Sequence, residues 1–440
     1  MAWPHSDAAA EFVIVGLAPR IRTPANARPR TARRASAFSD SREPGRKART
    51  PLTHSRLRQA SELPPIARIA GDSVRLRDGG LRAVLDCPAL ASRIRGDAEQ
   101  SAVVEGWAEL LNQLTHPLEI VIRSRPHDPS RAPARGDHCP AARVDAQARV
   151  SDGHAGRQRW AERRFVVVVP LDRHARAQAP EPPRELVALE QRVQLIEGSL
   201  RRLDPEAHRL RDHELAALLG QGLDPGAGEE PDLASGSVPA PAVLASASGL
   251  VERAGWVFVG GRFARTIALS RYPARPQPGL FSSLGAFAGD LDIALHVHPS
   301  AGSTAMAFLE GRVADLTSTV ELLERCGPAH LYGRAALDDA VELRERVARG
   351  SERLFDSGLY ATLWARTLDE LDAATRSLEA LLAGWIIETH RLLFRMRDGL
   401  LDSQPLGVEP VALWRPLSTS ALSAMLSFTA SHSAPRPGLP

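Results

Sequence analysis

The feature that most constrains the fold is the stretch of residues 337–396, where the spacing of apolar side chains switches between a helical and an extended period. Its first part carries an apolar face at helical spacing, opposite acidic and arginine residues. This face consists of Leu337, Ala340, Leu343 and Val347. After Gly350 the segment GLYATLWAR alternates with period two. The pattern therefore predicts an amphipathic helix followed by a strand.

A capping box opens the next element. Thr367 is followed three residues later by Glu370, a pair that satisfies the first free amides of a helix. The predicted helix turns Leu371, Leu378, Leu381 and Leu382 toward a core. After Gly384 the segment HRLLFRM, residues 390–396, predicts a second strand. Strand, crossover helix and strand form a split unit, so this half is predicted to be a ferredoxin-like module of an α+β fold.

A matching split β-α-β unit is predicted in the first half of the chain. SVRLRDGGLRAVLDC, residues 73–87, predicts a hairpin, because Gly79 and Gly80 accept positive φ angles. An apolar stripe over residues 97–114 then predicts a helix that ends before Pro117. LEIVIRSR and RFVVVVP predict two further strands. In the second half, Gly260 and Gly261 predict another hairpin, and LDIALHVHP another strand.

Two segments carry apolar residues at alternating steps of three and four, which is the spacing of a coiled-coil seam. The first seam is Leu186, Leu189, Val193, Ile196, Leu200 and Leu203, and the second is Met306, Leu309, Val313, Leu316, Val320 and Leu323. Pro205 breaks the first seam and can begin a second helix, so a helical hairpin is predicted over residues 185–219. Two interpretations stay open: packing within a hairpin, or arms that protrude to contact a neighbour.

Shifts in composition divide the chain into five predicted parts. Residues 1–62 are an Arg/Pro-rich tail with few large apolar residues, which predicts disorder. Residues 63–219 are the first α/β module, with a flexible insertion at 126–163. Residues 220–249 are a linker rich in Gly, Pro, Ala and Ser. Residues 250–400 are the second α/β module, and 401–440 are expected to be a connector toward an ATPase domain that this chain lacks.

The tail concentrates the positive charge of the chain. Residues 1–60 hold eleven arginines and Lys47 against four carboxylates, whereas the whole chain has a net charge of +3. Such a tail could contact nucleic acid or an anionic lipid surface. An upstream extension without a selected function is an equally good interpretation.

The remaining composition indicates the compartment. The three cysteines are odd in number and far apart, which argues against a disulfide framework and against a zinc site. No apolar run approaches the roughly 20 residues that span a bilayer. The sequence therefore predicts a cytoplasmic protein.

The order of these elements resembles the TraC-type conjugal-transfer ATPases that power type IV secretion. The resemblance covers about residues 63–440. It is carried by VRLRDGGLRAVLDC with LLNQLTHPLEIVIRSRPHD, by LDIALHVHPSAGSTAMAFLEGRVADL, by DDAVELRERVARGSERLFDSGLYATLWARTLDELDAATRSLEALL, and by SQPLG followed by WRPLSTSALSAMLSFTASH. It implies an N-terminal α/β region that docks on inner-membrane components of the secretion apparatus and packs against like subunits, peripheral on the inner face of the membrane.

The sequence departs from this family at the phosphate-binding loop. A Walker A loop needs a lysine beside its glycines, and the only lysine here is Lys47, which is followed by Ala48. Arginine does not replace that compact charge. We therefore expect a non-catalytic docking and oligomerisation region, truncated before the nucleotide-binding domain, whose ATPase partner could be encoded separately. No catalytic, cofactor-binding or metal-ligating residue is predicted.

The alternative is a stand-alone nucleic-acid-binding accessory protein that uses the tail and the insertion. Its candidate contacts mix basic and aromatic character, which suits phosphate and base stacking. They are Arg157, Arg159, Trp160, Arg163 and Arg164. The competing interpretation is a solvated loop whose charges protect strand ends.

His296 and His298 lie two residues apart on a predicted strand, so both side chains share one face. Two imidazoles without a third ligand are more often ordinary polar positions than a metal site.

Overall fold

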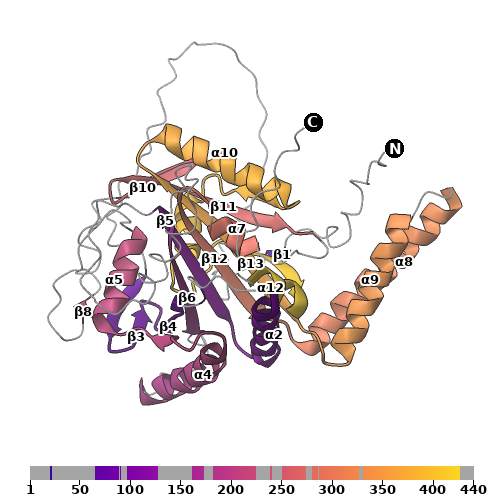
Figure 1. Cartoon of the computed structure of the whole chain (residues 1–440), viewed down its shortest axis with the longest axis horizontal. Helices are drawn as coiled ribbons and strands as arrows, with labels where there is room; N and C mark the ends of the chain where they lie inside the picture. Colours follow the sequence, from indigo (N-terminus) through magenta and orange to yellow (C-terminus); the bar gives the residue numbers. More distant parts are fainter. Residues whose placement is uncertain are drawn as a thin grey trace, which may run out of the picture.

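The computed structural model describes residues 20–21, 65–88, 90, 97–126, 161–172, 182–223, 238–239, 250–273, 280–285, 287–326 and 331–426. Within them, the chain is a mixed helix and strand structure built on one sheet whose strand pairs are all antiparallel (Figure 1). The main path of the sheet runs β8-β2-β3-β4-β6-β5-β12-β13-β11-β10-β9. Both halves of the chain therefore belong to a single sheet, joined where β5 pairs with β12.

The first half supplies the strands on one side of that junction. Its strands are β2 (Ile66–Ala70), β3 (Ser73–Leu76), β4 (Leu81–Asp86), β5 (Leu118–Pro126), β6 (Ala161–Leu171), β7 (His208–Arg209) and β8 (Val238–Pro239). Its helices are α2 (Asp97–Gln113), α4 (Pro182–Leu203) and α5 (Asp212–Leu223). Because β7 pairs with β4, the local order of strands is β7-β4-β6-β5.

The second half repeats this arrangement. Its strands are β9 (Val251–Arg253), β10 (Trp256–Val259), β11 (Arg262–Arg271), β12 (Asp290–Pro299), β13 (Leu354–Ala365), β14 (Glu388–Arg391) and β15 (Leu413–Ser418). Its helices are α7 (Leu280–Gly285), α8 (Gly302–Cys326), α9 (Leu331–Ala348), α10 (Leu368–Gly384), α11 (Met396–Asp402) and α12 (Thr419–Leu426). The local order is β14-β11-β13-β12.

Both faces of the sheet are buried. Helices α2, α4, α7, α10 and α12 contribute to one core, which includes Trp107, Val193, Phe281, Leu378 and Met425. Helices α5 and α11 contribute to the core of the opposite face, which includes Leu215, Leu219, Met396 and Leu400. Each core contains strand residues from both halves of the chain.

Several local predictions are confirmed. Strand β13 alternates as expected: Leu359, Ala361 and Leu363 face the first core, whereas Tyr360 and Trp364 face the second. The capping box of α10 forms through Thr367 and Glu370 in both directions. The two glycine turns are also present, and Gly79, Gly260 and Gly261 have positive φ angles, whereas Gly80 does not.

The strand predicted over residues 390–396 is wrong in its position. Strand β14 ends at Arg391, and Met396 already begins α11. Between them Phe394 has a φ of 63°, a left-handed conformation that breaks an extended chain. These apolar residues therefore form a turn between the short strand β14 and the buried helix α11.

The helical hairpin predicted over residues 185–219 is also wrong. Strand β7 separates α4 from α5, and the two helices lie on opposite faces of the sheet. The seam residues of α4 pack against the sheet and α2 instead of forming an arm, except for the exposed Leu186. In the second half, α8 and α9 do form a helical hairpin, which extends away from the sheet (Figure 1).

The remaining predicted parts lie partly outside the described residues. This holds for the tail at 1–62 apart from β1 (Arg20–Ile21), for the insertion at 126–163 apart from its two strand ends, and for most of the linker at 220–249. Strand β1 pairs with β15. In the segment predicted as a connector, β15 pairs with β13 and α12 buries Leu422 and Met425 in the core.

Candidate functional site

Two pairs of oppositely charged side chains face each other across the β5–β12 seam. In the strand register Glu119 lies opposite His296, and Arg123 lies opposite Asp292. All four side chains are buried, on the face that is also covered by α5 and α11. Buried charges are costly unless they are paired, so these positions are the clearest departure of the sheet from an apolar core.

His296 is held as a cation by acceptors on both ring nitrogens. Nε2 donates to the backbone oxygen of Asp402 at 2.7 Å, and Nδ1 lies 3.3 Å from Oε1 of Glu409. Oε1 of Glu119 lies 3.7 Å from Nε2. A neutral imidazole donates through only one nitrogen, so this arrangement needs the protonated ring. Burial alone lowers the pKa of His296, but Glu409 and Glu119 outweigh it and raise that pKa to about 10.

The two carboxylates beside His296 have opposite shifts. Burial raises the pKa of Glu119 to about 7, although His296 and the amide of Gly407, which donates to Oε2 at 2.5 Å, oppose the rise. For Glu409, His296 and His298 outweigh the effect of burial and hold the pKa well below its usual range. Glu409 is therefore the ionised partner of His296, whereas Glu119 can hold a proton near neutral pH.

The second charge pair has further polar partners in both halves of the chain. Arg123 donates to the backbone oxygen of Leu218 in α5 at 2.6 Å and lies 3.8 Å from Asp292. Asp292 also accepts from Arg125 at 2.6 Å and from the indole of Trp364 at 2.8 Å. Burial lowers the pKa of Arg123 to about 10, against the attraction of Asp292. A guanidinium with this pKa stays charged at neutral pH.

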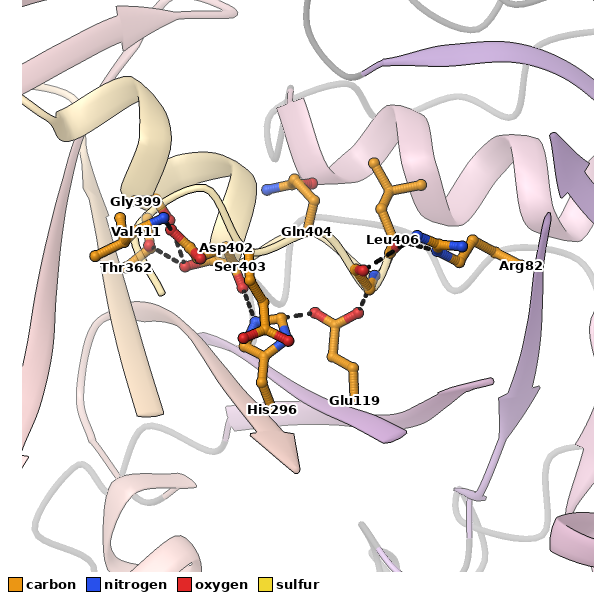
Figure 2. Close-up of polar contacts among 12 residues, drawn as sticks. Arg82, Glu119, His296, Thr362, Gly399, Asp402, Ser403, Gln404, Leu406 and Val411 are labelled. Carbon is orange, nitrogen blue, oxygen red and sulfur yellow. Dashed lines mark hydrogen bonds and ion pairs between the residues drawn. The ribbon is translucent and has the colours of Figure 1, made fainter. Parts of the chain in front are cut away.

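The segment 402–411 crosses the seam and closes it (Figure 2). Arg82 of β4 donates to the backbone oxygens of Leu406 and Gly407, at 2.5 and 3.2 Å. The hydroxyl of Ser403 lies 2.6 Å from that of Thr362 on β13. The segment is thereby tied to strands of both halves through buried polar groups.

His298 lies at the edge of the same cluster. Its ring stacks on Trp414, with ring centroids 4.5 Å apart, and Nε2 bonds Oε1 of Glu409. The indole of Trp414 donates to the other oxygen of Glu409. Both histidines are thus partnered by a carboxylate, and the described residues include no group of three or more side chains arranged to hold a metal ion.

We call the cluster of Glu119, Arg123, Asp292, His296 and Glu409 the ionic latch, because its contacts cross the β5–β12 seam. Its charged side chains are buried or partly buried, and their ion pairs join β5 of the first half to β12 of the second. A cavity of about 410 Å³ lies between α8 and the strands β11, β13, β14 and β15, and Trp414, which contacts Glu409 and His298, is part of its lining. The arrangement can join two halves of a sheet and respond to pH.

The residues predicted for nucleic acid are only partly described. Arg157, Arg159 and Trp160 lie outside the described residues. Arg163 and Arg164 lie on β6, and Arg164 pairs with Asp86 at 3.0 Å. Partial burial lowers the pKa of Arg163. The nucleic-acid contact stays a prediction.

Sequence reasoning missed the latch, although a signal was present. Glu119 and Arg123 interrupt the strand LEIVIRSR at alternate positions, and Asp292, His296 and His298 interrupt LDIALHVHP in the same way. Charges on one face of an otherwise apolar strand suggest a solvent-exposed face. Here that face is covered, and only the pairing of two distant strands shows which charges meet.

Comparison with protein-family models and with curated proteins found no match to this chain. Among the described residues, no helix has both the length and the apolar character needed to cross a membrane.

Proposed function

We propose that this chain is a non-catalytic docking and assembly region of a conjugal-transfer ATPase of the TraC type. In this proposal it acts at the inner face of the cell membrane, binds inner-membrane components of a type IV secretion apparatus and packs against like subunits. ATP is hydrolysed by a separate motor domain. The observation that supports the proposal best is the helical arm formed by α8 and α9.

The arm is attached to the rest of the molecule mainly at its base. There Ala305 and Leu309 pack with Leu354 of β13. Farther out, Leu316 packs against Ala336 and Ala340 of α9. Among the large apolar side chains of the arm, Leu322 is 61% exposed. A pair of helices that extends from a sheet and contributes to neither of its two main cores is better explained by contact with another molecule than by the stability of its own fold.

Within this proposal each half is a ferredoxin-like module. The strand orders β7-β4-β6-β5 and β14-β11-β13-β12 support it, because both place the fourth strand beside the first and the third strand between the first and second. Each half also has a helix between its first and second strands and another between its third and fourth. The arm is an insertion between the second and third strands of the second module.

Removal of the arm tests the proposal. At the ends nearest the arm, β12 and β13 pair through Pro299 and Phe355. Residues 301–352 can therefore be replaced by a short glycine-containing turn. We expect the intact chain to be oligomeric by light scattering and the shortened chain to be monomeric, with an unchanged melting temperature of the body. Leu322→Ser, at an exposed position of α8, should weaken assembly, whereas Leu195→Ser, on the exposed face of α4, should not. An intact chain that is monomeric at all concentrations, or an oligomer that survives removal of the arm, contradicts the proposal.

The nucleic-acid alternative has its own test. Deletion of residues 1–60 should abolish DNA binding, and the affinity of the intact chain should fall steeply with salt, if the arginine-rich tail is the contact. Binding that is unaffected by both changes excludes this role. Because Arg164 is paired with Asp86, the described residues favour the assembly role.

A further inference from the structure

The cavity of about 410 Å³ lies at the base of the arm, between α8 and the strands β11, β13, β14 and β15. Cavities of about 300–1,000 Å³ are the usual size of binding sites in proteins. Part of the lining is apolar and comes from both the arm and the sheet. These side chains are Ala305, Ala307, Phe308, Leu354, Trp414 and Pro416. We call this space the arm-base cavity.

The charged part of the lining has both signs. It consists of Arg271, Arg312, Arg415, Asp315, Asp356 and Glu388. Arg271 pairs with Glu388 at 2.8 Å, whereas the carboxylate of Asp356 has no hydrogen-bond partner within the described residues. Such a lining does not select an ion of one sign. Apolar walls with both donors and acceptors suit a peptide segment, because each residue of its main chain offers an N–H and a C=O.

Strand β1 brings the N-terminal tail to this cavity. Its register places Arg20 opposite Trp414, which is part of the lining. Because the pairing is antiparallel, a chain that continues from Arg20 toward the N-terminus advances in the direction of Arg415 and Pro416, which also line the cavity. Pro19 and Pro416 have no N–H, so a regular ladder ends at this point. The residues before Pro19 therefore start beside the cavity without a strand partner that requires them.

The sequence before β1 suits an apolar cavity. Residues 12–18 read FVIVGLA, and residues 1–19 contain neither arginine nor lysine, unlike the rest of the tail. Three β-branched residues in this run favour an extended conformation. An apolar run of this kind is unfavourable in water and promotes aggregation unless it is covered. Since it is tethered at β1, its effective concentration at the cavity is high.

We propose that residues 12–18 dock in the arm-base cavity, with apolar side chains against Phe308 and Trp414 and a main-chain N–H donated to Asp356. The docked segment joins the tail, the sheet and α8 at one place, and so fixes the direction in which the arm extends. The inference goes beyond the proposed function, because it concerns a contact within one chain and needs neither a second subunit nor a secretion apparatus.

Disulfide cross-linking of the full chain tests the contact. One cysteine replaces Val15, and the other replaces Ala307, an exposed alanine of α8 that lines the cavity. The matched control carries its second cysteine at Ala314, an exposed alanine about 10 Å farther along the same helix. We expect Val15→Cys/Ala307→Cys to form a disulfide within one chain about tenfold faster than Val15→Cys/Ala314→Cys. Non-reducing gels and peptide mass spectrometry identify the product.

Substitutions in the tail test the same contact without altering the folded body. Phe12→Asp/Ile14→Asp should slow the cross-link to Ala307→Cys to the rate of the Ala314→Cys control, because charged side chains do not enter an apolar space unpaired. Ala8→Asp/Ala10→Asp, just before the apolar run, should leave the rate unchanged.

All variants carry Cys139→Ser/Cys326→Ser, which leaves the buried Cys87. Equal rates for the two cysteine pairs, or equal rates for the two aspartate variants, overturn the proposal. A disulfide that forms only between chains also overturns it and makes a second copy the occupant of the cavity. Loss of assembly on removal of the arm is measured separately by light scattering, so failure of the docking leaves the assembly role standing.

Discussion

At the scale of single residues, the β5–β12 seam is built with an approximate two-fold symmetry. Val121 and Ala294 pair at its centre. The two charge pairs lie on either side of this central pair, each two residues away from it along the strands. The acids Glu119 and Asp292 occupy equivalent positions of their strands, and so do the bases Arg123 and His296. Each base also donates to a backbone oxygen of the helix that follows its own module, Leu218 in α5 or Asp402 in α11. Such a self-complementary contact is typical of a two-fold interface.

The latch predicts how stability depends on pH. The pKa of His296 is raised from an unfolded value near 6.5 to about 10, so its contribution is fully present below about pH 6.5 and is lost as pH rises through 10. We expect His296→Gln to lower the free energy of unfolding by about 3 kcal/mol near pH 6 and by much less near pH 10. Urea unfolding at a series of pH values measures the difference. His390→Gln, at an exposed position of β14, should show a constant small effect, and a pH-independent cost at His296 would refute the latch.

Two helical glycines make a matched test of the packing beside the latch. A Cβ atom on Gly222 in α5 would lie 1.9 Å from Oε1 of Gln404 and 2.5 Å from a nitrogen of Arg123. Gly222→Ala should therefore destabilise the fold by about 1–3 kcal/mol. Gly198 in α4 has open space at the same position, so Gly198→Ala should stabilise by about 0.5–1 kcal/mol. Thermal denaturation of both variants checks the contrast, which equal effects would disprove.

At the scale of elements, α10 shows what a short sequence motif can predict. Its capping box is contained within four residues, and the helix starts where the sequence indicates. The apolar run at residues 390–396 was predicted to be a strand. This prediction is wrong because the chain turns at Phe394 and brings Met396 into the core under the sheet. Local hydrogen bonds determine where a helix begins, whereas burial of a side chain decides whether the next apolar run is a strand or a turn.

The capping box can be tested alone. Thr367→Ala removes the side-chain acceptor for the amide of Glu370 and should lower the free energy of unfolding by about 1 kcal/mol. Thr319→Ala, in the interior of α8, removes a hydroxyl that bonds only the preceding turn, so it should be neutral or slightly stabilising. Chemical denaturation of the two variants measures both effects. Equal losses would show that the cap contributes nothing specific.

At the scale of the whole molecule, the continuous sheet predicts one cooperative unit. Each core draws side chains from both halves, and Ile122 pairs with Ile293 across the seam. Ile293→Ala should cost about 2–5 kcal/mol and shift the unfolding of both halves together. Circular dichroism and tryptophan fluorescence should then report the same midpoint in urea. Two separate transitions would show that the halves are independent domains.

The sequence by itself determined the elements whose signals are local: the glycine turns at Gly79 and Gly260, the capped start of α10, and the alternation along β13. It also indicated two similar halves. Only the tertiary structure decided that β5 and β12 pair, that α4 and α5 lie on opposite faces, and that Glu119 meets His296. The contacts between β5 and β12 join residues more than a hundred positions apart. The free energy of all three arrangements depends on burial in the assembled sheet, which no single segment can specify.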